Sequence, residues 1–284
     1  MLFLILSIIC SVAVGVIFKI SRSYNGNAFQ VIAFNYVAAI GLCYFIFSPN
    51  MDQVSAKAPW NVYLAIGILL PVVFHFLVLS IQHMGIVKTD AAQRLSLFIP
   101  ILAAWLIFNE DFNLYKIIGL LIGFFALLLI FNKPSANIQS QKWIFTTFVL
   151  IGFGIIDILF KQIALYTSLP YTTSLFVVFD ISLAVSLFIL IYQAIVKKVR
   201  LECKNFLFGV LVGVFNFGNI LFYLKAHKAF SENPSTVFAS MNMGVIVLGT
   251  FVGVLFFKEK LSKINFAGVI LALIAIVFIV ISQL

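Results

Sequence analysis

Hydrophobic residues occur along the chain in long continuous runs that are separated by short polar connections. Each run has roughly the 20 residues that a helix needs to cross a hydrocarbon core of about 30 Å. Because the runs do not alternate between apolar and polar residues, they favour helices over strands. The pattern predicts an all-α integral membrane protein with ten transmembrane helices. The expected spans are Leu2–Ile20, Phe29–Ser48, Asn61–Ile81, Ala91–Phe108, Ile117–Phe131, Trp143–Lys161, Thr172–Val196, Phe206–Leu224, Pro234–Phe257 and Ile264–Ser282.

Composition supports this prediction, since 63% of the 284 residues are hydrophobic and only 10% are charged. A soluble domain could not cover its surface with so few charges. In a soluble protein the net charge of +9 would suggest nucleic acid as a partner. Here the basic residues lie in short connections, where they meet lipid headgroups and set orientation. We therefore expect a multi-pass protein of the cell inner membrane that contacts membrane lipid and no nucleic acid.

Short motifs recur in the same order before and after the polar connection 132–142. Phe18-Lys19 at the end of the first span recurs as Phe160-Lys161 at the end of the sixth. The other matches pair Phe34-Asn35 with Phe179-Asp180, then Phe108, Glu110 and Gly119 with Phe257, Glu259 and Gly268, and Gln93 with Asn242. We therefore predict two related halves, residues 1–132 and 142–284. With five helices in each half, the second half must enter the membrane from the opposite side, so the repeats are inverted.

These features resemble the drug/metabolite transporter superfamily, in its EamA-like branch. The resemblance covers nearly the whole chain and rests on five plus five helices and on a lysine that ends helices one and six. It also rests on an acidic residue in the turns Asn109-Glu110-Asp111 and Lys258-Glu259-Lys260. It implies a central cavity lined mainly by helices one, three, four, six, eight and nine. Members of this family move amino acids, other metabolites, nucleotide sugars or drugs.

Charged residues inside the spans are the first candidates for function, because each costs roughly 2.5 to 3.5 kcal/mol at bilayer depth. Asp157 and Lys161 are four residues apart and are expected to form an ion pair on one helix face, and Asp90 and Arg94 repeat that spacing. Lys161 would hold a substrate carboxylate, and Asp157 would hold an amine or a proton. For Lys161, and for Lys19 as a gating residue, the alternative is snorkelling to the headgroups.

The amides Gln93 and Asn242 occupy equivalent places on two helices that line the family's cavity, and neutral amides can recognise both ends of a zwitterion. We expect Asn216, Asn219 and Ser240 to extend this polar lining. The alternative for Gln93 and Asn242 is hydrogen bonding between helices, worth about 0.6 kcal/mol.

Four more polar residues in the spans have two open interpretations each. His75, in the third span, is either a substrate-binding proton relay or a packed histidine. Asp180, Asn35 and Tyr36 are either coupling and gating groups or partners in bonds to neighbouring helices. Glu110 and Glu259 are expected to stabilise the starts of the fifth and tenth helices, where the helix dipole favours an anion.

The function predicted from these residues is secondary transport, most simply export of amino acids or related metabolites by alternating access. A broad-specificity drug exporter of the same fold is the alternative, and it would favour aromatic walls and an acidic residue over amides. An enzyme is not expected, because neither a nucleophile motif nor a phosphate-binding loop is present and no motif supports a His75–Asp180 dyad. We expect a small-molecule substrate, no cofactor or metal, and a monomer or homodimer.

The side of the membrane that the termini face is left open by the sequence. The family usually keeps both termini in the cytoplasm. The basic residues between helices seven and eight would then face outward, against the positive-inside tendency. These residues are Lys197, Lys198, Arg200 and Lys204.

Overall fold

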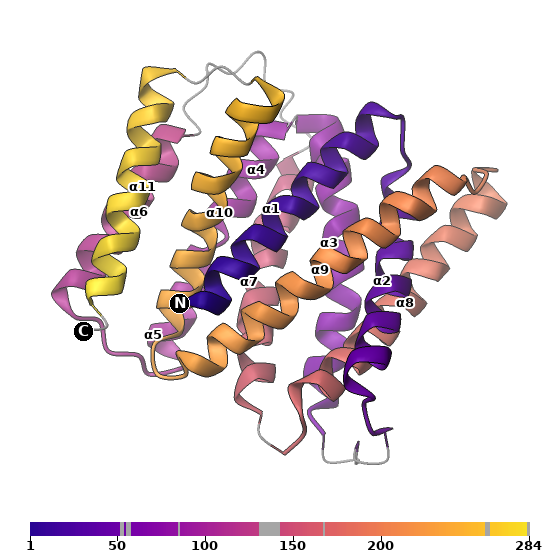
Figure 1. The fold of residues 1–284 in the computed structure, drawn as a ribbon, viewed down its shortest axis with the longest axis horizontal. Helices are drawn as coiled ribbons and strands as arrows, with labels where there is room; N and C mark the ends of the chain where they lie inside the picture. Colours follow the sequence, from indigo (N-terminus) through magenta and orange to yellow (C-terminus); the bar gives the residue numbers. More distant parts are fainter. Residues whose placement is uncertain are drawn as a thin grey trace.

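The protein is an all-helical bundle in the computed structural model, which describes residues 1–51, 54, 58–84, 86–130, 143–166, 168–258 and 262–282. Within these residues the chain forms eleven α-helices (Figure 1). They are α1 (Leu2–Ser23), α2 (Ala28–Phe47), α3 (Trp60–Met84), α4 (Ile86–Leu95), α5 (Phe98–Leu106), α6 (Leu114–Ile130), α7 (Trp143–Leu165), α8 (Tyr171–Val196), α9 (Cys203–Ala229), α10 (Pro234–Phe257) and α11 (Lys263–Ile281). The predicted all-α class is confirmed.

The helices have the length and composition of membrane spans. Eight of them are long and apolar enough to cross a membrane, and the shorter apolar stretches Ala92–Leu106 and Leu114–Ile130 complete the set. Large apolar side chains cover the outside of the bundle, with Phe45, Phe188 and Phe256 more than 70% exposed. Such a surface is stable only in lipid. The chain is therefore a multi-pass membrane protein.

The fourth span is broken, whereas the sequence predicted one continuous helix. Pro100 has no amide hydrogen to donate, and the Ser96 carbonyl instead accepts from the Ile99 amide at 3.0 Å. The Ser96 hydroxyl donates to the Gln93 carbonyl at 2.6 Å. The break separates α4 from α5 and leaves Gln93 near the end of a half-helix.

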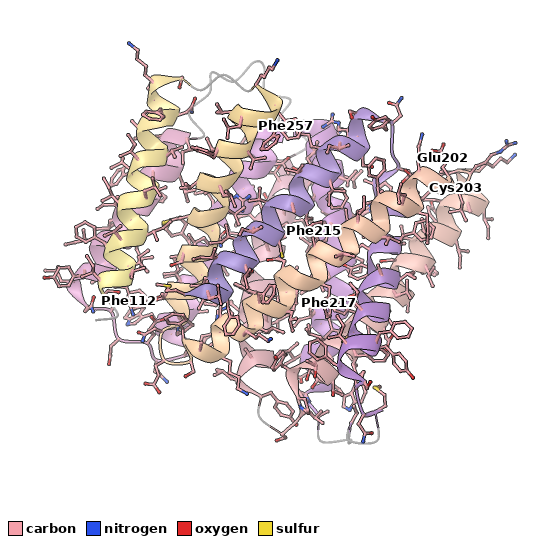
Figure 2. All side chains as sticks on the ribbon, in the orientation of Figure 1. Phe112, Glu202, Cys203, Phe215, Phe217 and Phe257 are labelled. Carbon is pink, nitrogen blue, oxygen red and sulfur yellow. The ribbon has the colours of Figure 1, made fainter. Side chains whose placement is uncertain are left out.

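The bundle has two ends, which we name by the lysine near each. At the Lys19 face, the Lys19 ammonium lies 3.8 Å from the centroid of the Phe257 ring, where α10 ends. At the Lys161 face, Lys161 donates to the carbonyl of Ser231, shortly before α10 begins. The two lysines therefore lie at opposite ends of α10, as inverted repeats require. Figure 2 shows Phe257 and Phe112 at these opposite ends.

The two halves of the chain pack against each other in a symmetric way: a contact between two helices is matched by a contact between their counterparts in the other half. The end spans α6 and α11 pair at one edge of the bundle (Figure 1), and α2 pairs with α8. The contact of α1 with α9 has its counterpart in the contact of α7 with α3. This exchange supports the duplication of residues 1–132 in 142–284, which stays a prediction.

Glycines explain why α6 and α11 approach so closely. A Cβ atom added at Gly119 would lie 2.8 Å from Ile279 and 3.1 Å from the Ala275 carbonyl. At the matching Gly268 it would lie 2.7 Å from Ile130 and 2.9 Å from the backbone of α6. Each glycine thus gives the opposite backbone room to pack, as small residues do between membrane helices.

Candidate functional site

A polar group of three side chains joins α4, α7 and α9 inside the bundle. The Tyr223 hydroxyl donates to Asp157 Oδ1 at 2.9 Å. Arg94, two residues before the break in the fourth span, acts electrostatically on the same carboxyl. We call Arg94, Asp157 and Tyr223 the Asp157 group. It places a carboxyl group and a guanidinium beside an interrupted helix, which is where carriers commonly bind their solutes.

Lys161 lies one helical turn beyond Asp157 and has partners of its own. Its ammonium donates to the Ser231 carbonyl at 2.7 Å and lies 3.5 Å from the His227 carbonyl. These contacts replace the predicted ion pair with Asp157. Since Lys161 is 0% exposed, it does not snorkel to the headgroups. It connects α7 to the turn between α9 and α10.

Glu110 forms a second buried cluster at the Lys161 face. Its carboxylate accepts from the Lys116 ammonium at 2.6 Å, from the Ser235 hydroxyl at 2.5 Å and from the Ser235 amide at 2.8 Å. Glu110 therefore caps the start of α10 and not that of α6, where the sequence placed it. The side chain of Asn113 caps α6 instead, accepting from the Lys116 amide. Glu259, the other predicted cap, lies outside the described residues.

His227 is part of this region, although the sequence analysis missed it. Its ring lies 4.6 Å from the Tyr223 ring and 4.8 Å from the Phe238 ring, measured between centroids. The side chain is fully buried, and neither ring nitrogen has a hydrogen-bond partner among the described residues. The signal was present, because Tyr223 and His227 are four residues apart on one face of α9.

The predicted amides lie on the two expected spans. Gln93 is half-buried on α4, next to Arg94. Asn242 is half-buried on α10, and its amide donates to the Phe238 carbonyl of its own helix at 3.0 Å. Ser240 is 5% exposed, and its hydroxyl has no partner in the described part of the chain. That these side chains line one cavity stays a prediction.

Three other predicted residues bond between helices. Asn216 on α9 donates to the side chain of Asn35 on α2 at 3.0 Å. Asn219 accepts from the hydroxyl of Ser7 on α1 at 2.8 Å. For Asn35 this geometry matches the alternative interpretation, a bond to a neighbouring helix. Asn216 and Asn219 were expected to line the cavity and here take part in bonds between helices.

The remaining candidates lie toward α2, α3 and α8. The buried ring of Tyr36 lies 6.4 Å from that of Phe179. Asp180 is half-buried on α8, within electrostatic reach of Cys43 on α2. His75 lies against Phe29, with 4.5 Å between ring centroids. The structure thus groups Asp157 and Lys161 with Tyr223 and His227, and it places Tyr36, Asp180 and His75 elsewhere.

Comparisons with known proteins agree with this picture. The EamA-like transporter family matches residues 1–132 of the chain. A protein of Haemophilus influenzae, described as an uncharacterized protein, is 44% identical over 285 residues, covering 96% of this chain and 95% of the relative. A solved structure, described as a crystal structure of protein, has a TM-score of 0.74 at 13% identity. That match covers 100% of this chain and 98% of the other.

Proposed function

Because the chain belongs to the EamA-like transporter family, within the drug/metabolite transporter superfamily of small-solute carriers, we propose that it exports amino acids or related zwitterionic metabolites. Export proceeds across the cell inner membrane by alternating access. The proposal rests on one observation, that the Arg94 guanidinium lies within electrostatic reach of the Asp157 carboxyl inside the bundle.

The Asp157 group suits a zwitterion. A planar guanidinium binds a carboxylate through two parallel hydrogen bonds, so Arg94 would hold the acid end of the solute. Asp157, oriented by the Tyr223 hydroxyl, would accept from the ammonium end. A bound zwitterion replaces the attraction between Arg94 and Asp157 with two charged contacts and leaves neither residue uncompensated. A neutral solute would not do so, and buried unpaired charge is costly.

Alternating access follows from the predicted inverted repeats, which can exchange their conformations at little cost in free energy. The contacts of Lys161 close the bundle at one end. At the other end, Gly15 of α1 is exposed and has open space beside it. Ile8 and Gly15 share a face of α1, and Ile8 lies against Gly244, but a methyl group at Gly15 would meet nothing within 4 Å.

Counterflow in liposomes tests the proposal. Purified protein should exchange labelled amino acids across the bilayer. Arg94→Gln and Asp157→Asn should each weaken apparent affinity some five- to 150-fold, since a buried group left unpaired costs about 1 to 3 kcal/mol. Arg22→Gln, which removes an exposed charge at the end of α1, is the matched control. The proposal fails if the wild type moves no amino acid, or if Arg22→Gln is as defective as Arg94→Gln.

A drug exporter is the second candidate, because aromatic rings gather near the same carboxylate. Phe74 lies 6.3 Å from Phe18 and 6.0 Å from Phe153 between ring centroids, and Phe153 is one turn from Asp157. Aromatic faces attract organic cations. The two candidates differ in Arg94, which a cationic drug does not need. Drug resistance that survives Arg94→Gln but not Asp157→Asn would favour the drug exporter.

A further inference from the structure

A cavity of about 370 Å³ lies between α3 and α8, away from the Asp157 group. Its apolar part is lined by Val72, Phe188 and Ile189. Phe188 is 74% exposed on the outside of the bundle, so the cavity opens toward the lipid. A solute from water would have to pass through the bilayer to reach this opening, whereas a lipid molecule is already beside it.

The other part of the cavity is polar. It is lined by His75, Tyr192, Gln193 and Lys197. Gln193 is only 5% exposed, and its side-chain oxygen Oε1 has no hydrogen-bond partner in the described residues. The same holds for the buried Nδ1 atom of His75. Buried polar atoms nearly always have a hydrogen-bond partner. Two such atoms without a partner in one cavity therefore indicate a ligand that forms hydrogen bonds there.

Charge indicates what that ligand carries. Lys197 caps the end of α8 at the Lys19 face and is close enough to His75 to interact with it electrostatically. Lys198 and Arg200 follow in the connection after α8, and Lys204 lies in the first turn of α9. A cluster of basic residues at the end of a membrane helix attracts anionic headgroups. The ligand is therefore expected to be anionic at the Lys197 end and apolar at the Phe188 end.

We propose that this cavity binds an anionic glycerophospholipid. The phosphate lies at Lys197, and a headgroup hydroxyl donates to the side-chain oxygen of Gln193. An acyl chain runs along Val72, Phe188 and Ile189. Tyr192, which is 53% exposed, lies little more than one helical turn before Lys197, and tyrosine is enriched where a membrane meets water. Because α3 and α8 come from different halves of the chain, a lipid held between them connects the two halves at their outer side.

Lipid titration of the purified protein in detergent tests this inference, with binding followed by native mass spectrometry and by thermal unfolding. Phosphatidylglycerol should bind and raise the unfolding temperature more than phosphatidylcholine does. Lys197→Gln should weaken phosphatidylglycerol binding about five-fold, from the loss of one contact between lysine and headgroup. The matched control is Lys204→Gln, in the same basic cluster but outside the cavity, where the lysine pairs with Glu202 at 2.8 Å. It should bind as the wild type does.

Gln193→Leu and Ile189→Trp separate a built site from surface attraction. Gln193→Leu removes the side-chain oxygen that has no partner, and Ile189→Trp fills the apolar part of the cavity. Both changes should reduce the number of lipids that the protein retains. Equal binding of the two lipids overturns the inference. So does an equal loss in Lys197→Gln and Lys204→Gln, which would mean that charge at this face acts without a site.

Discussion

The Lys19 and Lys161 ends of the bundle carry matching residues in different arrangements. Lys161 is fully buried and bound to backbone carbonyls, whereas Lys19 is exposed and lies over the Phe257 ring. The preceding phenylalanines differ as well. Phe160 meets Tyr223 edge to face, so that this ring contacts the residue that binds Asp157. The Phe-Lys motif is thus buried and hydrogen-bonded at the Lys161 end, which we call the locked end, and its lysine is exposed at the Lys19 end.

Under the proposed alternating access, this difference between the two ends would reverse during transport. Glu110, Lys116 and Ser235 add a buried, charge-assisted network to the Lys161 end. At the Lys19 end, the exposed Gly15 of α1 has open space beside it. If the halves exchange conformations, Lys19 should become buried as Lys161 is released.

Orientation is the largest expected effect, because its readout is all or none. Basic residues gather at the Lys19 face, in Arg22, Lys197, Lys198, Arg200, Lys204, Lys258 and Lys263. The positive-inside tendency therefore predicts that this face meets the cytoplasm, and that both termini lie outside. Alkaline phosphatase fused after Leu284 should be active, and a fluorescent protein that requires the cytoplasm should be dark. The opposite pair of results would place the locked end in the cytoplasm.

Stability should depend strongly on the network at the Lys161 face. Glu110→Gln leaves the Lys116 ammonium, which is 1% exposed, without its carboxylate. Breaking a buried ion pair typically costs about 3 to 5 kcal/mol, so the unfolding temperature in detergent should fall clearly. The reference is Glu202→Gln at the Lys19 face, where the partners of Lys204–Glu202 are 41% and 49% exposed. That change should cost less than about 1 kcal/mol. Equal losses would mean that the two ends do not differ in this way.

Much of this fold could be predicted from the sequence, because lipid imposes simple rules. Apolar runs gave the spans, and Pro234–Phe257 was predicted to the residue. The lysines at opposite ends followed from two short motifs. The break at Ser96 was missed because the Pro100 signal was not used, although a proline at this position cannot donate to the Ser96 carbonyl.

The partners of the polar residues were harder to predict, because they depend on how helices rotate against each other. Asp157 and Lys161 share a helix face, and spacing alone suggested that they bind each other. The approach of α9 instead provides Tyr223 for one and backbone carbonyls for the other. Glu110 was assigned to the helix next in sequence, although it caps one 125 residues away. Local spacing cannot show contacts between distant helices.

Removing Lys161 should make the interior of the bundle more accessible to water-soluble reagents than removing Lys19 does. In a variant with Cys10, Cys43 and Cys203 replaced by serine, Ser240→Cys reports entry to the buried part of α10. Adding Lys161→Met removes charge-assisted bonds worth about 1.5 to 3 kcal/mol, so labelling by an impermeant maleimide should rise at least about ten-fold. Lys19→Met removes an exposed cation–π contact and should change labelling about two- to five-fold. A larger effect at Lys19 would reverse the assignment of the locked end.

The smallest effect expected is at Gln93 and Asn242, which the repeat places at equivalent positions in the two halves. Replacement by leucine roughly keeps the volume and removes a hydrogen-bonding group. Gln93 ends a broken helix beside Arg94, so Gln93→Leu should weaken solute affinity about five-fold, equivalent to about 1 kcal/mol. Asn242 already donates to the Phe238 carbonyl of its own helix, and Asn242→Leu should therefore cost less. Asn219→Leu, which breaks only the bond to Ser7 between helices, should alter stability and leave affinity unchanged. If Gln93→Leu and Asn242→Leu both insert normally and transport with unchanged affinity and rate, these amides only tie helices together, and the solute binds elsewhere.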